Sequence, residues 1–190
     1  MPQSVPYCLV FSKCWKQCLN VFLIFFVTLA VFPVIQTNVF PSNPELFGTS
    51  ERTKKYFAAV FCFFCFNFSA MLGNLIPNFY TLPGPNKLWI PVVLRFAFIP
   101  FFLFSNLLPA TRTLPVYFGN DHLYLIVCIV FAMSSGYLSS LAMMYAPRSA
   151  PPEYAGTAAM MAAASLMTGI FIGVTVSPYI MMIVCLKPPS

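Results

Sequence analysis

Five long apolar segments follow one another along the chain, and short polar connections separate them. They cover about residues 17–36, 56–78, 88–108, 122–146 and 155–184. Each is close to or above the roughly 20 residues that a helix needs to cross a bilayer. Apolar residues run continuously through the segments instead of alternating with polar ones, which is typical of membrane helices and not of strands. The pattern predicts an all-α polytopic membrane protein: a bundle of five transmembrane helices over residues 17–185, with an interfacial tail over 1–16 and a C-terminal tail over 186–190.

The second segment has polar residues on one side and small residues on the other. At 100° per residue, Asn74 and Asn78 each lie about 20° from Asn67 on the helical wheel, so the three amides form one stripe. On the opposite side, small residues recur at every fourth position: Cys65, Ser69 and Gly73. Such a seam allows another helix to approach closely. The amides can either line a solute path or hydrogen-bond a neighbouring helix, and the sequence leaves both roles open.

Two later segments contain further small residues at helical spacing. Gly136 and Ser140 lie about one turn apart in the fourth segment, as do Gly169 and Gly173 in the fifth. We expect these residues to serve helix packing, as the seam of the second segment does. For the fourth segment, a polar function remains an alternative.

Arg95 is the one charged residue within the five segments. An arginine in mid-span costs about 2.5–3.5 kcal/mol unless it faces the bundle interior or water. Because Arg95 lies about two turns from Lys87, its side chain could also snorkel to the membrane surface. No acidic residue occurs in any segment. Arg95 is therefore either a snorkelling side chain or a structural or gating charge whose partner is a carbonyl, a solute or another part of an assembly.

The composition agrees with lipid as the main solvent of this chain. The sequence is 59% hydrophobic and only 7% charged, whereas about a quarter of the residues of a soluble domain are charged. The net charge of +6 includes no basic run longer than a pair. We therefore expect no nucleic-acid partner, and we expect the loop charges to lie near lipid headgroups.

The sequence contains no pattern that predicts catalysis. Its acidic residues all fall in the connections between segments: Glu45, Glu51, Asp121 and Glu153. No two acidic residues are therefore available to form the paired carboxylates of a dry catalytic pocket. The single histidine, His122, has no companions at metal-ligand spacing, and no phosphate-binding glycine loop is present. We expect the chain to be neither an enzyme nor a holder of metals or cofactors.

Short motifs in the first four segments and in the loop before the fifth give the chain a family resemblance. They are Phe32-Pro33, Phe66-Asn67 followed by Leu72-Gly73, Arg95 to Pro100 (RFAFIP), Ser135-Gly136-Tyr137-Leu138 followed by Ser140-Leu141, and Pro152-Glu153. In this order and spacing, they resemble the C-terminal part of the equilibrative nucleoside transporter family. The resemblance extends from Lys16 to about Val184.

The resemblance implies a whole transporter of eleven helices, six plus five, in a fold similar to the major facilitator superfamily. This chain resembles the later five. The implied activity is facilitated diffusion of nucleosides or nucleobases by alternating access between two bundles. The implied location is the plasma membrane, with a cytoplasmic N-terminus and an extracellular C-terminus. The count of positive loop charges alone slightly favours the reverse orientation.

Two positions of the second segment depart from the family pattern. Where relatives carry an acidic and a basic residue important for transport, this chain has Ala70 and Asn74. Our main hypothesis is a partial or truncated transporter homologue, in which Asn67 and Asn74 hydrogen-bond a solute or a six-helix partner bundle. The alternative is a non-transporting membrane protein that associates with full-length transporters or other helices.

Overall fold

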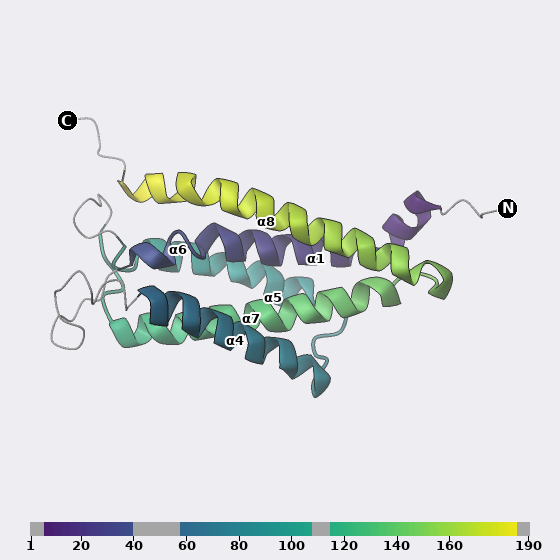
Figure 1. Cartoon of the computed structure of the whole chain (residues 1–190), viewed down its shortest axis with the longest axis horizontal. Coiled ribbons are helices and arrows are strands. Elements are labelled where there is room, and N and C mark those ends of the chain that lie inside the picture. The colour runs from purple at the N-terminus through teal and green to yellow at the C-terminus, as the bar shows by residue number, and fades with distance from the viewer. Residues whose placement is uncertain (1–5, 40–57, 108–114, 186–190) are drawn as a thin grey trace.

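The structure, a computed structural model, describes residues 6–39, 58–107 and 115–185. Within these ranges the chain forms five helical rods that lie side by side and alternate in direction (Figure 1). α1 begins at one end of the bundle, and α8 ends at the other. The predicted all-helical architecture is confirmed for the described part of the chain. The expected tails at 1–5 and 186–190 lie outside it.

The first rod begins earlier than the apolar run predicts. α1 spans Tyr7–Val31, and after a turn the 3-10 helix η1 (Gln36–Asn38) follows. Helix therefore covers most of the expected tail over residues 1–16. The reason is tertiary packing: Val10 and Cys14 are buried in a cluster with alanines of α7 and α8. Such packing of one face stabilises a helix beyond its own propensity.

The second rod is continuous and consists of three kinds of helix. They are the π-helix η2 (Ala58–Phe64), α4 (Cys65–Leu75) and the 3-10 helix η3 (Ile76–Asn78). The expected first residues of this segment, at 56 and 57, lie outside the described residues. Pro77 is placed in the first turn of η3, where its missing N–H is tolerated.

The third rod is short and irregular. α5 (Trp89–Leu94), the 3-10 helix η4 (Arg95–Ala97) and α6 (Phe98–Leu103) follow one another. Pro91 and Pro100 lie in the first turns of α5 and α6, and because Pro100 cannot donate to the carbonyl of Phe96, one regular α-helix does not run through both. The rod ends at Leu103, before the expected residue 108, because the chain then forms isolated bridges: Val39 with Leu107 and Ser105 with Phe118.

The last two rods are long helices whose bounds match the expected segments closely. α7 spans Asp121–Arg148, and α8 spans Ala155–Cys185 after the 3-10 helix η5 (Pro152–Tyr154). Asn120 caps α7, because its side-chain oxygen accepts the backbone N–H groups of His122 at 3.0 Å and Leu123 at 3.3 Å. This satisfies donors that the first turn of a helix leaves without partners.

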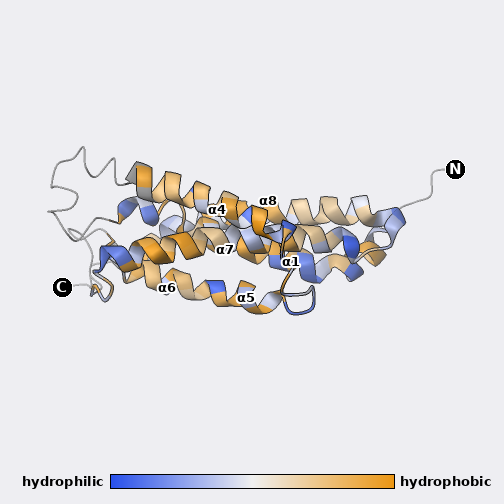
Figure 2. Cartoon of the chain, turned by 90° about the horizontal axis from the view of Figure 1, so that it is seen from below, coloured by the Kyte–Doolittle hydropathy of each residue, from blue (hydrophilic) through white to orange (hydrophobic). Residues whose placement is uncertain are grey.

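Three of the described helices are long and apolar enough to cross a membrane. They are Tyr7–Asn38, Asp121–Arg148 and Pro152–Ile183. The apolar rod Trp89–Leu103 is shorter. Its length of about 22 Å, at 1.5 Å per residue, falls short of a hydrocarbon core of about 30 Å. Figure 2 shows hydrophobic residues along the rods and hydrophilic ones gathered toward their ends.

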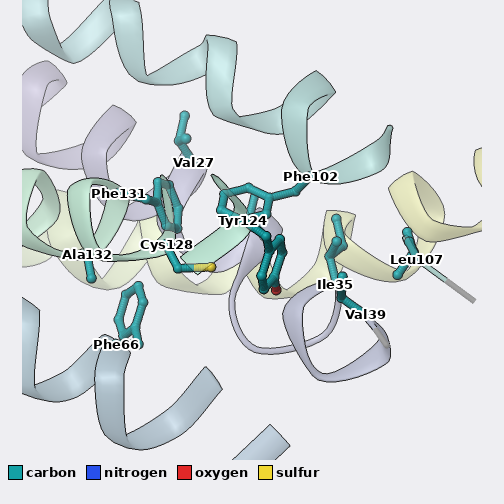
Figure 3. Close-up of a cluster of buried hydrophobic side chains, with 11 residues drawn as sticks. Val27, Ile35, Val39, Phe66, Phe102, Leu107, Tyr124, Cys128, Phe131 and Ala132 are labelled. Atoms are coloured by element: carbon teal, nitrogen blue, oxygen red, sulfur yellow. The ribbon is translucent and has the colours of Figure 1, made fainter. Parts of the chain in front are cut away.

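Two helix pairs dominate the packing. α1 packs most extensively against α8 and also contacts α7, α5 and α6, while α4 packs against α7. Figure 1 shows the same pairs side by side. One core cluster is centred on Phe131 of α7, whose ring centroid lies 6.0 Å from that of Phe66, 5.1 Å from Phe98 and 5.4 Å from Phe102. Tyr124 extends this aromatic group toward one end of the bundle (Figure 3).

Candidate functional site

Arg95 lies inside the bundle and joins three helical elements. Its side chain is only 1% exposed. Nη1 donates to the carbonyl oxygen of Phe131 at 2.9 Å and also to the hydroxyl of Ser134. Nη2 donates to Oγ1 of Thr28 at 2.9 Å. The guanidinium thus connects η4 with α1 and α7, and this contradicts the snorkelling interpretation.

The hydroxyl of Thr28 is fully used by this arrangement. It donates to the carbonyl oxygen of Ile24 at 2.6 Å. Its oxygen lies 2.9 Å from Oγ of Ser135, and because the Thr28 proton is already engaged, Ser135 is the donor of that bond. Thr28 Oγ1 therefore accepts from both Arg95 and Ser135 and donates once, the full capacity of a hydroxyl.

An aromatic ring provides much of the remaining environment of the guanidinium. The Cζ atom of Arg95 lies 4.7 Å from the ring centroid of Phe131 and 6.0 Å from that of Phe98. Cation–π attraction is stronger when, as here, the cation is removed from water. Arg95 Nε has no hydrogen-bond partner among the described residues.

No carboxylate of the described residues lies near this charge. Asp121 is the first residue of α7, and Glu153 follows that helix in η5. At 1.5 Å per residue, Asp121 is about 20 Å along α7 from Ser134. Three neutral oxygens and an aromatic face therefore stabilise Arg95, and its positive charge stays without an acidic partner in this part of the chain.

The amides predicted to bind a solute lie on another side of the bundle. Asn67, Asn74 and Asn78 are all exposed, on the outer face of the α4 rod. Asn67 Nδ2 donates to the carbonyl oxygen of Phe63 in the same rod, at 2.8 Å. Asn74 Oδ1 accepts from Oγ of Ser140 in α7, at 2.9 Å. Asn74 thus makes an interhelical bond, whereas Asn67 faces outward.

Glycines create the closest approach between α4 and α7. A Cβ atom added at Gly73 would overlap the carbonyl oxygen of Met133, and one added at Gly136 would overlap that of Ala70. Ser69 is buried on the same face of α4, while Cys65 at the start of that helix is only half-buried. The expected small-residue seam therefore lies against α7 from Ser69 onward.

The glycines of α8 have the same relation to α1. A Cβ added at Gly169 would lie 2.6 Å from the carbonyl oxygen of Phe22, and one added at Gly173 2.7 Å from that of Phe26. Ser177 continues this row by donating to the carbonyl oxygen of Ala30 at 2.9 Å. We did not expect Ser177 from the sequence, although its spacing of four from Gly173 was a usable indication.

α7 separates the two candidate groups. One side of α7 faces α4 and carries four residues at helical spacing: Met133, Gly136, Tyr137 and Ser140. Phe131, Ser134 and Ser135 face Arg95 and Thr28 on another side. The structure thus brings Asn74 to Ser140 and Arg95 to Thr28, and it does not bring Arg95 to the outward face of α4.

Comparison with known proteins decides the family. The family model described as "Nucleoside transporter" matches residues 2–182. The chain belongs to the nucleoside transporter family. It is 32% identical to human equilibrative nucleoside transporter 2 over 170 residues, which are 88% of this chain and 36% of that protein. It is 33% identical to human equilibrative nucleoside transporter 1 over 171 residues, 89% of this chain and 35% of that protein.

A third relative is also named as a transporter. The adenosine transporter 1 of Crithidia fasciculata is 30% identical over 131 residues, which cover 66% of this chain and 22% of the relative. The chain spans about a third of the length of the two human relatives. These relatives are named as transporters, and the helices long and apolar enough for a membrane agree with that class.

Proposed function

We propose that this chain forms one bundle of an equilibrative nucleoside transporter and moves nucleosides or nucleobases by facilitated diffusion together with a second, six-helix bundle. The observation that carries the proposal is the family match over residues 2–182. The names of the relatives favour transport over the alternative of a non-transporting associated protein. In this proposal all five rods span the bilayer in a major-facilitator-like arrangement, with the shorter third rod completed by the non-helical residues that follow it.

The outer face of α4 is the proposed wall of the solute path. Exposed amides in a membrane helix are costly against lipid and are expected to face protein or water. Asn67 and Asn74 satisfy this expectation if the six-helix bundle covers them. The exposed rings of Phe64 and Phe68 stack on one another at 5.9 Å, next to Asn67. This group offers both an aromatic surface and amides to a nucleobase.

Arg95 is the proposed structural or gating charge of the bundle. Arg95 ties α1, η4 and α7 together and does not reach the outer face of α4. It would therefore affect transport indirectly, by fixing how these helices lie relative to one another. The proposed orientation places the N-terminus in the cytoplasm of a plasma-membrane protein. Four basic residues belong to the early part of α1, the loop before α5 and the end of α7, which share this side in the proposed topology: Lys13, Lys16, Lys87 and Arg148. Five basic residues fall in the connections and the tail on the opposite side, so the count of positive charges does not support this orientation, which is proposed from the family resemblance.

Uptake of labelled uridine or adenosine in transport-deficient cells tests this function. We expect no uptake from the chain alone and clear uptake when it is expressed with a six-helix half from a relative such as human equilibrative nucleoside transporter 2. Asn67→Leu should then raise the KM for uptake roughly five- to tenfold, the loss expected for one hydrogen bond to the solute.

A matched control for Asn67→Leu is Thr168→Leu. Thr168 is also an exposed polar residue whose hydroxyl bonds only to its own helix, to the carbonyl oxygen of Ala164 at 2.8 Å. It lies on α8, away from the proposed path, and its change should leave uptake unaltered. No uptake with or without the six-helix half would refute the proposed function, and equal effects of both substitutions would refute the role of Asn67.

A further inference from the structure

A cavity of about 240 Å³ lies between residues 15–20 of α1 and the loop that precedes α5. Its walls contain one cation, two amides and two indoles, but no acidic residue: Trp15, Lys16, Leu19, Asn20, Pro85, Asn86 and Trp89. We propose that this cavity binds the headgroup of an anionic phospholipid. The proposal concerns a surface away from α4 and does not depend on transport.

The walls of this cavity are held in place by hydrogen bonds. Gln17 Nε2 donates to the carbonyl oxygen of Pro85 at 3.0 Å, and Asn20 Nδ2 donates to Gln17 Oε1 at 3.2 Å. On the other side of the loop, the hydroxyl of Tyr145 donates to the carbonyl oxygen of Thr81 at 2.7 Å. Because α1 and α7 both hold the loop, the cavity is preformed, and binding does not have to order it.

The charge around the cavity suits a phosphate group. Lys16 lines the cavity, whereas Lys13 lies one turn earlier on α1 and outside the cavity wall. Lys87 lines a neighbouring hollow of the loop, which shares Pro85 and Asn86 with this cavity. The acidic residue that the structure describes at this end is Glu153, in the turn between α7 and α8. Ammonium and amide N–H groups are the donors that phosphate oxygens accept from.

The two tryptophans place the cavity at headgroup depth. Trp15 and Trp89 are the only tryptophans of the chain. Trp15 is 44% exposed and Trp89 is 57% exposed. Indoles concentrate at the interface between hydrocarbon and water, where their N–H meets the headgroups. Figure 2 shows the hydrophilic part of α1 close to the hydrophilic loop before α5. An anion bound at this depth is the headgroup of a membrane lipid, and Leu19 provides an apolar wall for its glycerol and upper acyl carbons.

The same two tryptophans make the proposal directly measurable. The chain is reconstituted in phosphatidylcholine vesicles that contain increasing fractions of phosphatidylserine brominated on its acyl chains. A second series reverses the labels, with brominated phosphatidylcholine and unlabelled phosphatidylserine. Bromine quenches tryptophan fluorescence on contact. Because both tryptophans of the chain line this cavity, the quenching reports on lipid that contacts it. We expect phosphatidylserine to compete at least about fivefold better than phosphatidylcholine, the attraction expected of one lysine at a membrane surface.

Two matched variants separate a site from general surface charge. Lys16→Gln should remove most of the preference, whereas Lys13→Gln, with the same charge change one turn away and outside the cavity wall, should keep it within about twofold. Both lysines are exposed, so neither change should disturb the fold, and circular dichroism checks this. Equal quenching by the two brominated lipids, or equal losses in the two variants, would overturn the proposal.

Discussion

Gly136→Ala is expected to lower the free energy of unfolding by about 3 kcal/mol, which is the cost of severe overpacking in a closed core. The added Cβ overlaps the carbonyl oxygen of Ala70, a backbone atom of α4 that cannot rotate away. α4 must therefore move, and the reciprocal contact between Gly73 and Met133 is disturbed as well. Thermal unfolding in detergent measures the effect when a thiol-reactive dye reports exposure of the buried cysteines: Cys14, Cys18, Cys62 and Cys128.

Gly156→Ala is the matched control for this experiment. Gly156 lies in α8, and nothing lies within 4 Å of a Cβ added there. The substitution should stabilise the protein by up to about 1 kcal/mol, because alanine has the higher helix propensity. The two glycine-to-alanine changes thus have opposite expected signs. Equal unfolding temperatures for the two variants would show that α4 and α7 do not cross as closely as described.

Thr28→Val is expected to destabilise the protein by about 2–4 kcal/mol, more than removal of the buried charge itself. Valine has nearly the same shape as threonine, but it leaves Arg95 Nη2 and the Ser135 hydroxyl without the acceptor that they share. Each buried group without a partner costs about 1–3 kcal/mol. Arg95→Met should change stability by only about 1 kcal/mol, since a well-packed apolar side chain often replaces a buried charge at little cost.

The double variant Thr28→Val with Arg95→Met isolates the interaction. With the guanidinium gone, the loss of the Thr28 hydroxyl leaves only the Ser135 hydroxyl without its partner, one buried group fewer than in Thr28→Val alone. The double variant should therefore be at least as stable as Thr28→Val alone, a coupling that a thermodynamic cycle of the four proteins measures. Simple additivity of the two single effects would mean that Thr28 and Arg95 do not stabilise each other. If Arg95 acts as a gating charge, Arg95→Met should fold and yet lose uptake when it is paired with a six-helix half.

The five rods could be predicted because apolar runs of membrane length are a strong pattern, but their ends depend on tertiary contacts. The start of α1 at Tyr7 follows a buried row that continues before the apolar run: Val10, Cys14, Gln17, Val21 and Ile24. This helical spacing was present in the sequence and indicates the longer helix. The end of α6 at Leu103 depends on tertiary contacts as well. Beyond Phe104, Ser105 and Leu107 leave the helix to bridge Phe118 and Val39.

The sequence could predict which residues belong to the candidate site, but it could not predict which of them bond to one another. Arg95 was identifiable as a buried cation without an intramembrane acid. Its partner Thr28 lies 67 positions earlier, and only the position of α1 relative to η4 could reveal this pairing. Helical geometry placed Asn67 opposite the small-residue seam, but it left open whether that side faces a neighbouring helix or a solute path. The bond between Asn74 and Ser140 required the crossing of two helices whose seams were predicted separately.

The contact of Gly73 with α7 limits how α4 can move. Any other residue of α4 turned into that position would bring a Cβ atom against the backbone of Met133, so α4 cannot roll about its own axis while α7 stays in place. The bonds from Tyr145 to the loop after α4 also resist sliding along α7. The direction in which Asn67 points is therefore fixed by the bundle. A solute or second bundle that contacts the Asn67 amide therefore has to approach from outside this bundle. If α4 moves to meet it, α7 and the helices packed against α7 have to move together with α4 as one body.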